Sequence, residues 1–198
     1  MKIESVELTG EFVRLEPLSL EKHFAALSKI GLDPDLWRWT VSEIKTAEDL
    51  REYLETALNE QNHGLSLPFV TIEKQSGIAV GSTRFGNIDA TNRRVEIGWT
   101  WIGKDWQRTF VNTEAKFLMF KHAFETWHCQ RVELKTDLPN SRSRAAIKRI
   151  GATEEGILRK HLITQSGRTR DTIYFSVLDD EWEQVKANLK ARLKKIEK

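Results

Sequence analysis

The chain has 198 residues, of which 39% are hydrophobic and 30% charged. That balance is typical of a protein with a packed core, and the length favours one domain. The net charge is +2, with acids and bases interspersed, so we expect no nucleic-acid partner. No apolar run approaches the ~18 residues of a membrane span, and the start has no signal-peptide pattern. We therefore expect a cytoplasmic protein without a membrane partner.

The first part of the chain predicts a short strand and two helices. Residues 12–16 alternate as in a strand that ends at Pro17. Residues 19–30 have helical apolar spacing, with Ser19 as a plausible N-terminal cap. Residues 46–61 repeat that spacing behind Thr46. A loop with two tryptophans, Trp37 and Trp39, separates the two predicted helices.

The apolar period then changes from about four residues to two. Residues 67–73, 78–87 and 94–102 each read as a strand, and turn-rich segments separate them. Three consecutive strands with short connections predict an antiparallel meander.

The second half of the chain alternates helices and strands. A helix is predicted at 112–127, a strand at 131–136 and a helix at 141–150 that Gly151 closes. The strand that ends at Ile102 and the strand from Arg131 should lie parallel, because a helix connects them.

The last elements are a hairpin, 153–164 with 168–177, and a helix from Asp179 to about residue 196. The whole order predicts an α/β (α+β) fold with helices on both faces of one sheet. We expect a mixed, mostly antiparallel sheet of about seven strands. The chain is expected to form a single domain, 1–198, with its core at about 11–182.

The segment WQRTFVNTEAK, residues 106–116, joins a predicted strand to a predicted helix. A helix start offers unpaired N–H groups that bind anions readily. Phosphate-binding turns usually carry glycines, however, and this segment has none. From these residues alone, an ordinary connection and an anion site are about equally plausible.

Several short motifs, taken in order, make the chain resemble the GNAT superfamily of acyl-CoA-dependent N-acyltransferases. The similarity is strongest to its ribosomal-protein N-terminal acetyltransferase branch, the RimJ/RimL-like group. It extends from about Val13 to Trp182. The motifs are VRLEPL at 13–18, EIGW at 96–99, WQ at 106–107, NTEAK at 112–116, RVELKTD at 131–137, Asn140 with Arg142, Ser143 and Ala146, GA at 151–152, EG at 155–156, and RDT at 170–172.

The resemblance implies an acetyl-CoA-dependent N-acetyltransferase whose loop holds the coenzyme A pyrophosphate on backbone N–H groups. Gln107 matches the first loop position, but Phe110 stands where the family has glycine and Asn112 where it has glycine or alanine. The implied coenzyme-binding residues are Trp101, Ile102, Gln107, Arg108, Thr109, Phe110, Val111, Asn112, Thr113, Asn140 and Ser143. If the Phe110 ring fills the pyrophosphate site, the alternative is a non-catalytic GNAT-fold binding module with a degenerate loop.

Three residues are candidates for the chemistry of acyl transfer. Glu96 is a candidate base on the strand before the loop, although it could instead be a surface carboxylate paired with Arg94 or Lys104. Ser143 matches the family position near the coenzyme sulfur and is a candidate proton donor, or else a cap of its helix. His161 is a further candidate base, or else an ordinary strand-surface histidine. Backbone N–H groups near Trp101 and Ile102 are implied to polarise the thioester.

The acceptor is expected to be an α-amino group of a protein or a small primary amine. Trp37 and Trp39 border the acceptor site in the resembled fold, although core packing suits them equally well. The histidines show no metal-ligand spacing, so we expect no metal. Cys129 is the only cysteine and is expected to be a small buried residue, so direct transfer in a ternary complex is favoured. A homodimer is one option for the oligomeric state, which the sequence leaves open.

Overall fold

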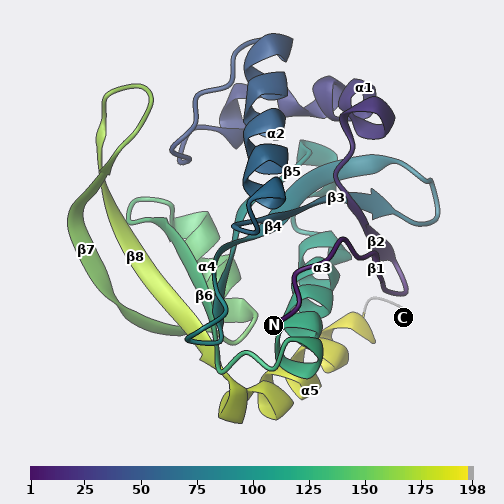
Figure 1. Cartoon of the computed structure of the whole chain (residues 1–198), viewed down its shortest axis with the longest axis vertical. Coiled ribbons are helices and arrows are strands. Elements are labelled where there is room, and N and C mark those ends of the chain that lie inside the picture. Colours follow the sequence, from purple (N-terminus) through teal and green to yellow (C-terminus); the bar gives the residue numbers. More distant parts are fainter. Residues whose placement is uncertain (196–198) are drawn as a thin grey trace.

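The fold, seen in a computed structural model that describes residues 1–195, is one open eight-stranded sheet with helices on both faces (Figure 1). The strand order is β1-β2-β3-β4-β5-β6-β8-β7, and among these strands of residues 1–195 only β5 and β6 pair in parallel. The strands are β1 Leu8–Thr9, β2 Val13–Pro17, β3 Leu67–Glu73, β4 Ala79–Asp89, β5 Arg94–Ile102, β6 Arg131–Asp137, β7 Thr153–Ile163 and β8 Thr169–Leu178. The predicted mixed, mostly antiparallel sheet is confirmed. The two-residue edge strand β1, which is too short to show alternation, was not predicted.

The helices divide between the two faces as expected. The α-helices are α1 Leu20–Gly31, α2 Ala47–Asn62, α3 Phe110–Lys121, α4 Ser141–Arg149 and α5 Trp182–Leu193. Helices α1 and α2 pack on β4 and β3, and their side chains form one apolar cluster. Helices α3, α4 and α5 contribute to the other cluster. No helix among residues 1–195 is long and apolar enough to cross a membrane.

Capping side chains fix where several helices begin. The Ser19 hydroxyl accepts from Lys22 N at the start of α1, and Thr46 and Asp49 form a capping box at α2. Helix α3 begins at Phe110, two residues earlier than predicted, because Thr109 is its cap. The last helix was expected from Asp179, but Asp179–Glu181 is a 3-10 turn before α5. Residue 196, the expected end of that helix, lies outside the described residues.

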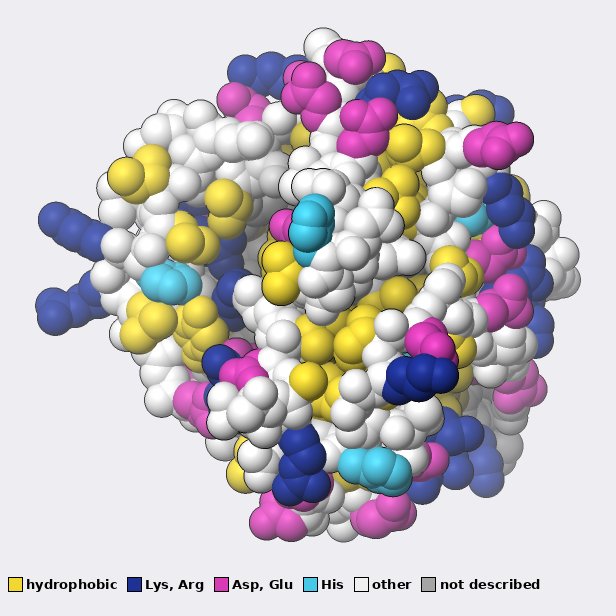
Figure 2. All heavy atoms as spheres, in the orientation of Figure 1, with side chains coloured by type: hydrophobic (Ala, Val, Ile, Leu, Met, Phe, Trp, Pro, Cys, Tyr) yellow, Lys and Arg dark blue, Asp and Glu magenta, His cyan; other side chains and the backbone are white. Residues whose placement is uncertain are grey.

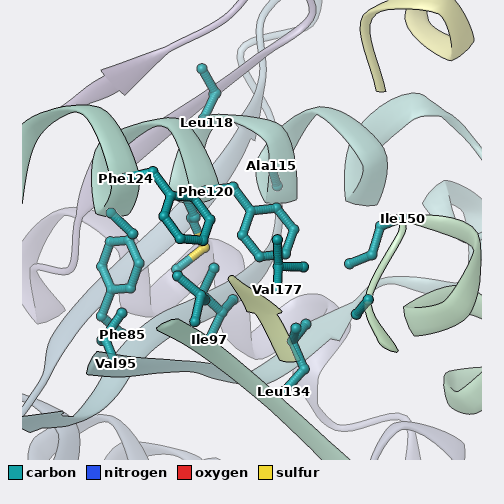
Figure 3. Packing of buried hydrophobic residues seen from close by; sticks show 14 of the residues in the cluster. Phe85, Val95, Ile97, Ala115, Leu118, Phe120, Phe124, Leu134, Ile150 and Val177 are labelled. Atoms are coloured by element: carbon teal, nitrogen blue, oxygen red, sulfur yellow. The ribbon is translucent and has the colours of Figure 1, made fainter. Parts of the chain in front are cut away.

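The main core lies between α3 and the sheet. Figure 3 shows Phe120 of α3, and Phe124 of the π-helical turn His122–Thr126 that continues it, pointing toward Phe85, Ile97 and Val177 on the strands. Burial of one such side chain contributes about 1.5–3 kcal/mol. Rigid packing of α3 on the sheet holds its N-terminus in a fixed place beside the end of β5.

The parallel strands β5 and β6 separate after a short paired stretch. Their register covers only Arg94 to Glu96 on β5 and 131–133 on β6. Further along, β5 carries a bulge, because Thr83 of β4 faces the interval between Gly98 and Trp101. Trp99 adopts φ +48° there, a left-handed conformation that costs a bulky residue about 1–2 kcal/mol. The open edges of β5 and β6 therefore frame a gap in the sheet.

Candidate active site

The loop between β5 and α3 is shaped by a left-handed residue and a threonine cap. Arg108 has φ +65°. The Thr109 hydroxyl donates to Trp106 O (2.7 Å) and accepts from Val111 N (3.3 Å). The first-turn amides of a helix have no partners within the helix and carry partial positive charge. The segment from Arg108 to Thr113, which includes Asn112, is thus chemically suited to an anion.

Phe110 does not occupy the strained position of this loop. It is the first residue of α3, and its ring packs on Phe12 with centroids 5.0 Å apart. The left-handed conformation belongs instead to Arg108, two residues earlier. The Phe110 side chain therefore joins the core around the N-terminal segment.

Gln107 ties the loop to two other elements. Its Nε2 donates to Ile102 O at the end of β5 (2.9 Å), and its Oε1 accepts from Arg142 Nη1 on α4 (2.9 Å). Asn140 caps α4 by accepting from Ser143 N (3.0 Å). The idea that Ser143 caps this helix is therefore wrong, because Ser143 lies in its first turn with its hydroxyl free of that role.

The backbone at the end of β5 turns alternately to β4 and to the gap. The Trp101 carbonyl points toward Gly81 of β4, where a Cβ added to the glycine would lie 2.2 Å from the carbonyl oxygen. Because successive peptide groups of a strand point to opposite edges, the Ile102 N–H and carbonyl point away from β4. The Ile102 carbonyl is taken by Gln107, which leaves its N–H directed toward the gap.

Glu96 is buried on the α1/α2 face of the sheet, 2% exposed, with two polar partners. Its Oε2 accepts from Asn87 Nδ2 (2.6 Å) and pairs with Lys135 Nζ on β6 (2.8 Å). The alternative partners named from sequence, Arg94 and Lys104, are wrong, since Arg94 pairs with Asp89 and Glu133. The sequence left Lys135 unnoticed, although the alternating polar residues of β6 would have placed it on this face.

Trp99 forms the floor beside this ion pair. A Cβ on Gly86 would lie 2.3 Å from its ring, so the indole rests directly on that glycine. The Arg84 guanidinium lies 4.1 Å from the ring centroid and pairs with Glu60 (2.9 Å). The bulge directs the Trp99 side chain onto Gly86, beside Glu96 and Lys135. The sequence analysis did not assign Trp99 to the site.

His161 lies at the side of this face, on β7. Its ring packs edge-on against Tyr174 of β8, with centroids 5.8 Å apart. Burial and the charges of Lys135 and Arg170 lower its pKa, while Glu96 acts in the opposite direction. His161 is therefore neutral at pH 7, and its Nδ1 has no partner among the described residues.

The two loop tryptophans have different surroundings. Trp37 is buried against Tyr53 and Trp101, and its Nε1 donates to Gly31 O (2.6 Å). Trp39 is half-buried, and its ring lies 5.8 Å from the guanidinium of Arg168, which lies in the turn just before β8. Trp37 is thus a core residue in this structure, and Trp39 lies beside the β7–β8 hairpin.

Two further expectations from the sequence concern Cys129 and a metal site. Cys129 is buried, and burial raises its pKa to about 11, so it is not poised as a nucleophile. Within residues 1–195, no group of three or more His, Cys, Asp or Glu side chains is arranged to hold a metal.

The mixed sheet with helices on both faces is the fold of the GNAT acetyltransferases. The model of the acetyltransferase (GNAT) domain matches residues 13–153, and the chain belongs to this family of N-acetyltransferases.

Two solved structures and one sequence relative illustrate the similarity. A structure from T. thermophilus, provisionally named an acetyltransferase, is 34% identical with TM-score 0.88, covering 98% of this chain and 100% of that one. RimJ of Mycobacterium smegmatis, solved in complex with CoA-disulfide, is 26% identical with TM-score 0.77, covering 91% and 88%. YdaF of Bacillus subtilis (strain 168), provisionally named a ribosomal N-acetyltransferase, is 36% identical over 54% of this chain. That match spans only 57% of the length of YdaF.

Proposed function

We propose that this enzyme transfers an acetyl group from acetyl-CoA to an α-amino group or a small primary amine. The observation that carries the proposal is the gap between β5 and β6. The N-terminus of α3 lies beside the end of β5, and the buried Glu96–Lys135 pair lies where the two strands separate. The proposal includes direct transfer in a ternary complex, because the lone cysteine is buried with a raised pKa.

The chain offers a fitting site for the coenzyme. The amides at 108–113, apart from the Val111 N–H that donates to Thr109 Oγ1, and the Arg108 guanidinium would hold the pyrophosphate. Asn140 and Ser143 would contact the arm of the coenzyme. The packing of Phe110 on Phe12 supports this proposal, because it gives the ring a place against the core. When bound, acetyl-CoA supplies an activated thioester carbonyl. The Ile102 N–H is the donor best placed to polarise that carbonyl.

Protein groups then handle the protons. Glu96 Oε2 is held by Asn87 and Lys135, while Oε1 lies over Gly98, whose missing side chain keeps that side open. Oε1 would accept the ammonium proton of the acceptor, directly or through water. Neutral His161 is the second candidate base. Ser143 would provide the proton that the departing sulfur takes up.

The chemistry of the base favours an acceptor of low pKa. At pH ~7.4, neutralising a lysine side chain costs about 4 kcal/mol, and an α-amine under about 1 kcal/mol. The name of YdaF points to a ribosomal acceptor for that relative. A protein N-terminus is therefore the acceptor we favour, in the cytoplasm, with the chain acting as one domain without a metal.

Calorimetry with acetyl-CoA tests the coenzyme part. We expect micromolar binding by the wild type and roughly tenfold weaker binding by Arg108→Gly, which keeps the loop conformation but loses the guanidinium. Phe110→Gly should bind no more tightly than the wild type. If only Phe110→Gly bound the coenzyme, the non-catalytic alternative would be correct.

Steady-state acetylation of an amidated serine peptide tests the base. We expect Glu96→Gln to lower kcat/KM by roughly 10²–10⁴, while acetyl-CoA binding is unchanged and so reports an intact fold. Glu133→Gln, a carboxylate on the same face of β6, is the matched control. Equal losses in the two variants would remove Glu96 from its role.

A further inference from the structure

Three cations near Glu96 on this face of the sheet have carboxylate partners. Arg84 pairs with Glu60, Lys135 with Glu96, and Arg168 with Asp137. Arg170 on β8 is a further cation near Glu96. Figure 2 shows the surface hollowed between the β7–β8 hairpin and α2, with Lys and Arg side chains at the hollow.

Arg170 is buried, with 6% of its surface exposed. Its side chain makes no hydrogen bond or ion pair with any residue from 1 to 195, and its Nε is buried without a partner. Burial lowers its pKa, and the nearby Asp137 only partly offsets that effect. Burying a guanidinium nitrogen without a partner is costly, so an anion bound by Arg170 from outside the chain would stabilise this position.

Two neighbouring side chains on this face each have one buried oxygen without a partner. Asp137 and Thr172 are opposite each other in the β6–β8 register, and Arg170 is two residues from Thr172 on the same face. Asp137 Oδ1 and Thr172 Oγ1 are buried and have no partner among the described residues. The Arg170 guanidinium, the Asp137 carboxylate and the Thr172 hydroxyl thus belong to one small part of this face.

The hairpin and the α1–α2 loop form a rim beside this spot. Arg168 holds the other oxygen of Asp137 and lies 5.8 Å from the Trp39 ring. At the hairpin tip, Gln165 N donates to Val41 O (2.9 Å), and Glu43 N donates to Gln165 Oε1 (2.7 Å). Since Arg168 already holds Asp137 from this rim, Asp137 is not available as a full counter-ion for Arg170.

We propose that Arg170 binds a carboxylate carried by the acceptor itself, an inference that rests on the proposed function. Lys135, the partner of Glu96, is opposite Tyr174, and Arg170 lies four residues along β8 from Tyr174, about 13 Å of backbone. The long Arg170 side chain shortens that span. The carboxylate therefore lies one or two residues from the reacting amine, as an acidic side chain or as the free carboxyl group of a short peptide.

Calorimetry with matched peptides tests the inference without turnover. The probes are Ser-Glu-Ala-amide, its isostere Ser-Gln-Ala-amide, and Ser-Ala with a free carboxyl group. The proteins are the wild type, Arg170→Gln, Arg170→Lys and the control Arg159→Gln, which changes an exposed arginine on β7. The Glu peptide and the dipeptide separate the two sources of the carboxylate.

We expect the wild type to bind at least one carboxylate probe roughly 10–100-fold more tightly than the Gln peptide. Arg170→Gln should abolish that preference, Arg170→Lys should keep part of it, and Arg159→Gln should keep all of it. Equal binding of the three probes by the wild type, or a preference that survives Arg170→Gln, would overturn the inference. If the preference depends on Arg170 but no probe is acetylated, the carboxylate site stands and the proposed activity fails.

Discussion

Lys116 of α3 gives a prediction that can be worked through from the structure. It is 5% exposed, and its Nζ donates to Thr100 Oγ1 (2.6 Å) beneath the β5 bulge and to Thr83 Oγ1 (3.1 Å). Burial lowers its pKa to about 7, against about 10.4 in the unfolded chain. Between these values the unfolded chain binds a proton that the folded protein has lost. The free energy of unfolding should therefore rise with pH by about 1.4 kcal/mol per unit, and by about 4–5 kcal/mol over the window.

The assay is urea unfolding of the wild type and Lys116→Met at pH 7, 8 and 9. From pH 7 to 9 the stability of the wild type should rise relative to the variant by about 2–3 kcal/mol. That corresponds to about 1 M urea or more in the relative midpoint. Lys121→Met, an exposed lysine on the same helix, should show no such drift. Parallel pH profiles for the wild type and Lys116→Met would refute the reasoning and mean that Lys116 keeps its ordinary pKa.

Two further predictions concern other close contacts. The buried Glu114 carboxylate accepts from the N–H groups of Glu11, Phe12 and Val13 at 2.8, 2.8 and 2.6 Å, so Glu114→Gln should cost about 3 kcal/mol in urea unfolding. The exposed Glu183→Gln should change stability by under about 0.5 kcal/mol, and equal effects would contradict the assignment. Gly86→Ala places a methyl group 2.3 Å from the Trp99 ring. We expect altered near-UV circular dichroism and weaker acceptor binding, while the affinity for acetyl-CoA is kept. An unchanged spectrum would contradict the contact.

Most elements could be predicted because their signals are local. Alternation gave the limits of β3 and β5, and the hydroxyls of Ser19 and Thr46 marked the starts of two helices. The short strand β1 could not be predicted, since two residues show no period. The partners of Glu96 come from β4 and β6, and only the tertiary structure brings them together.

The loop before α3 shows how a family pattern can mislead at one position. The expected glycine at 110 suggested that Phe110 would carry the strain or block the site. In the structure the helix already includes Phe110, and the left-handed residue is Arg108. The Thr109 cap marks where the helix begins, and the left-handed residue lies two positions before Phe110.

The bulge in β5 changes which side chains of this strand point to each face of the sheet. Val95 and Ile97 belong to the cluster under α3, and strict alternation would place Trp101 on that face too. One extra residue between Gly98 and Trp101 inverts the alternation, so Trp101 packs in the α1/α2 cluster instead. The same inversion turns Thr100 toward Lys116 on the α3 side. The bulged register lets β5 contribute side chains to both apolar clusters. A bulge also bends its strand, and this one lies beyond the stretch where β5 pairs with β6. The gap between the two strands therefore follows from core packing on the two faces of the sheet.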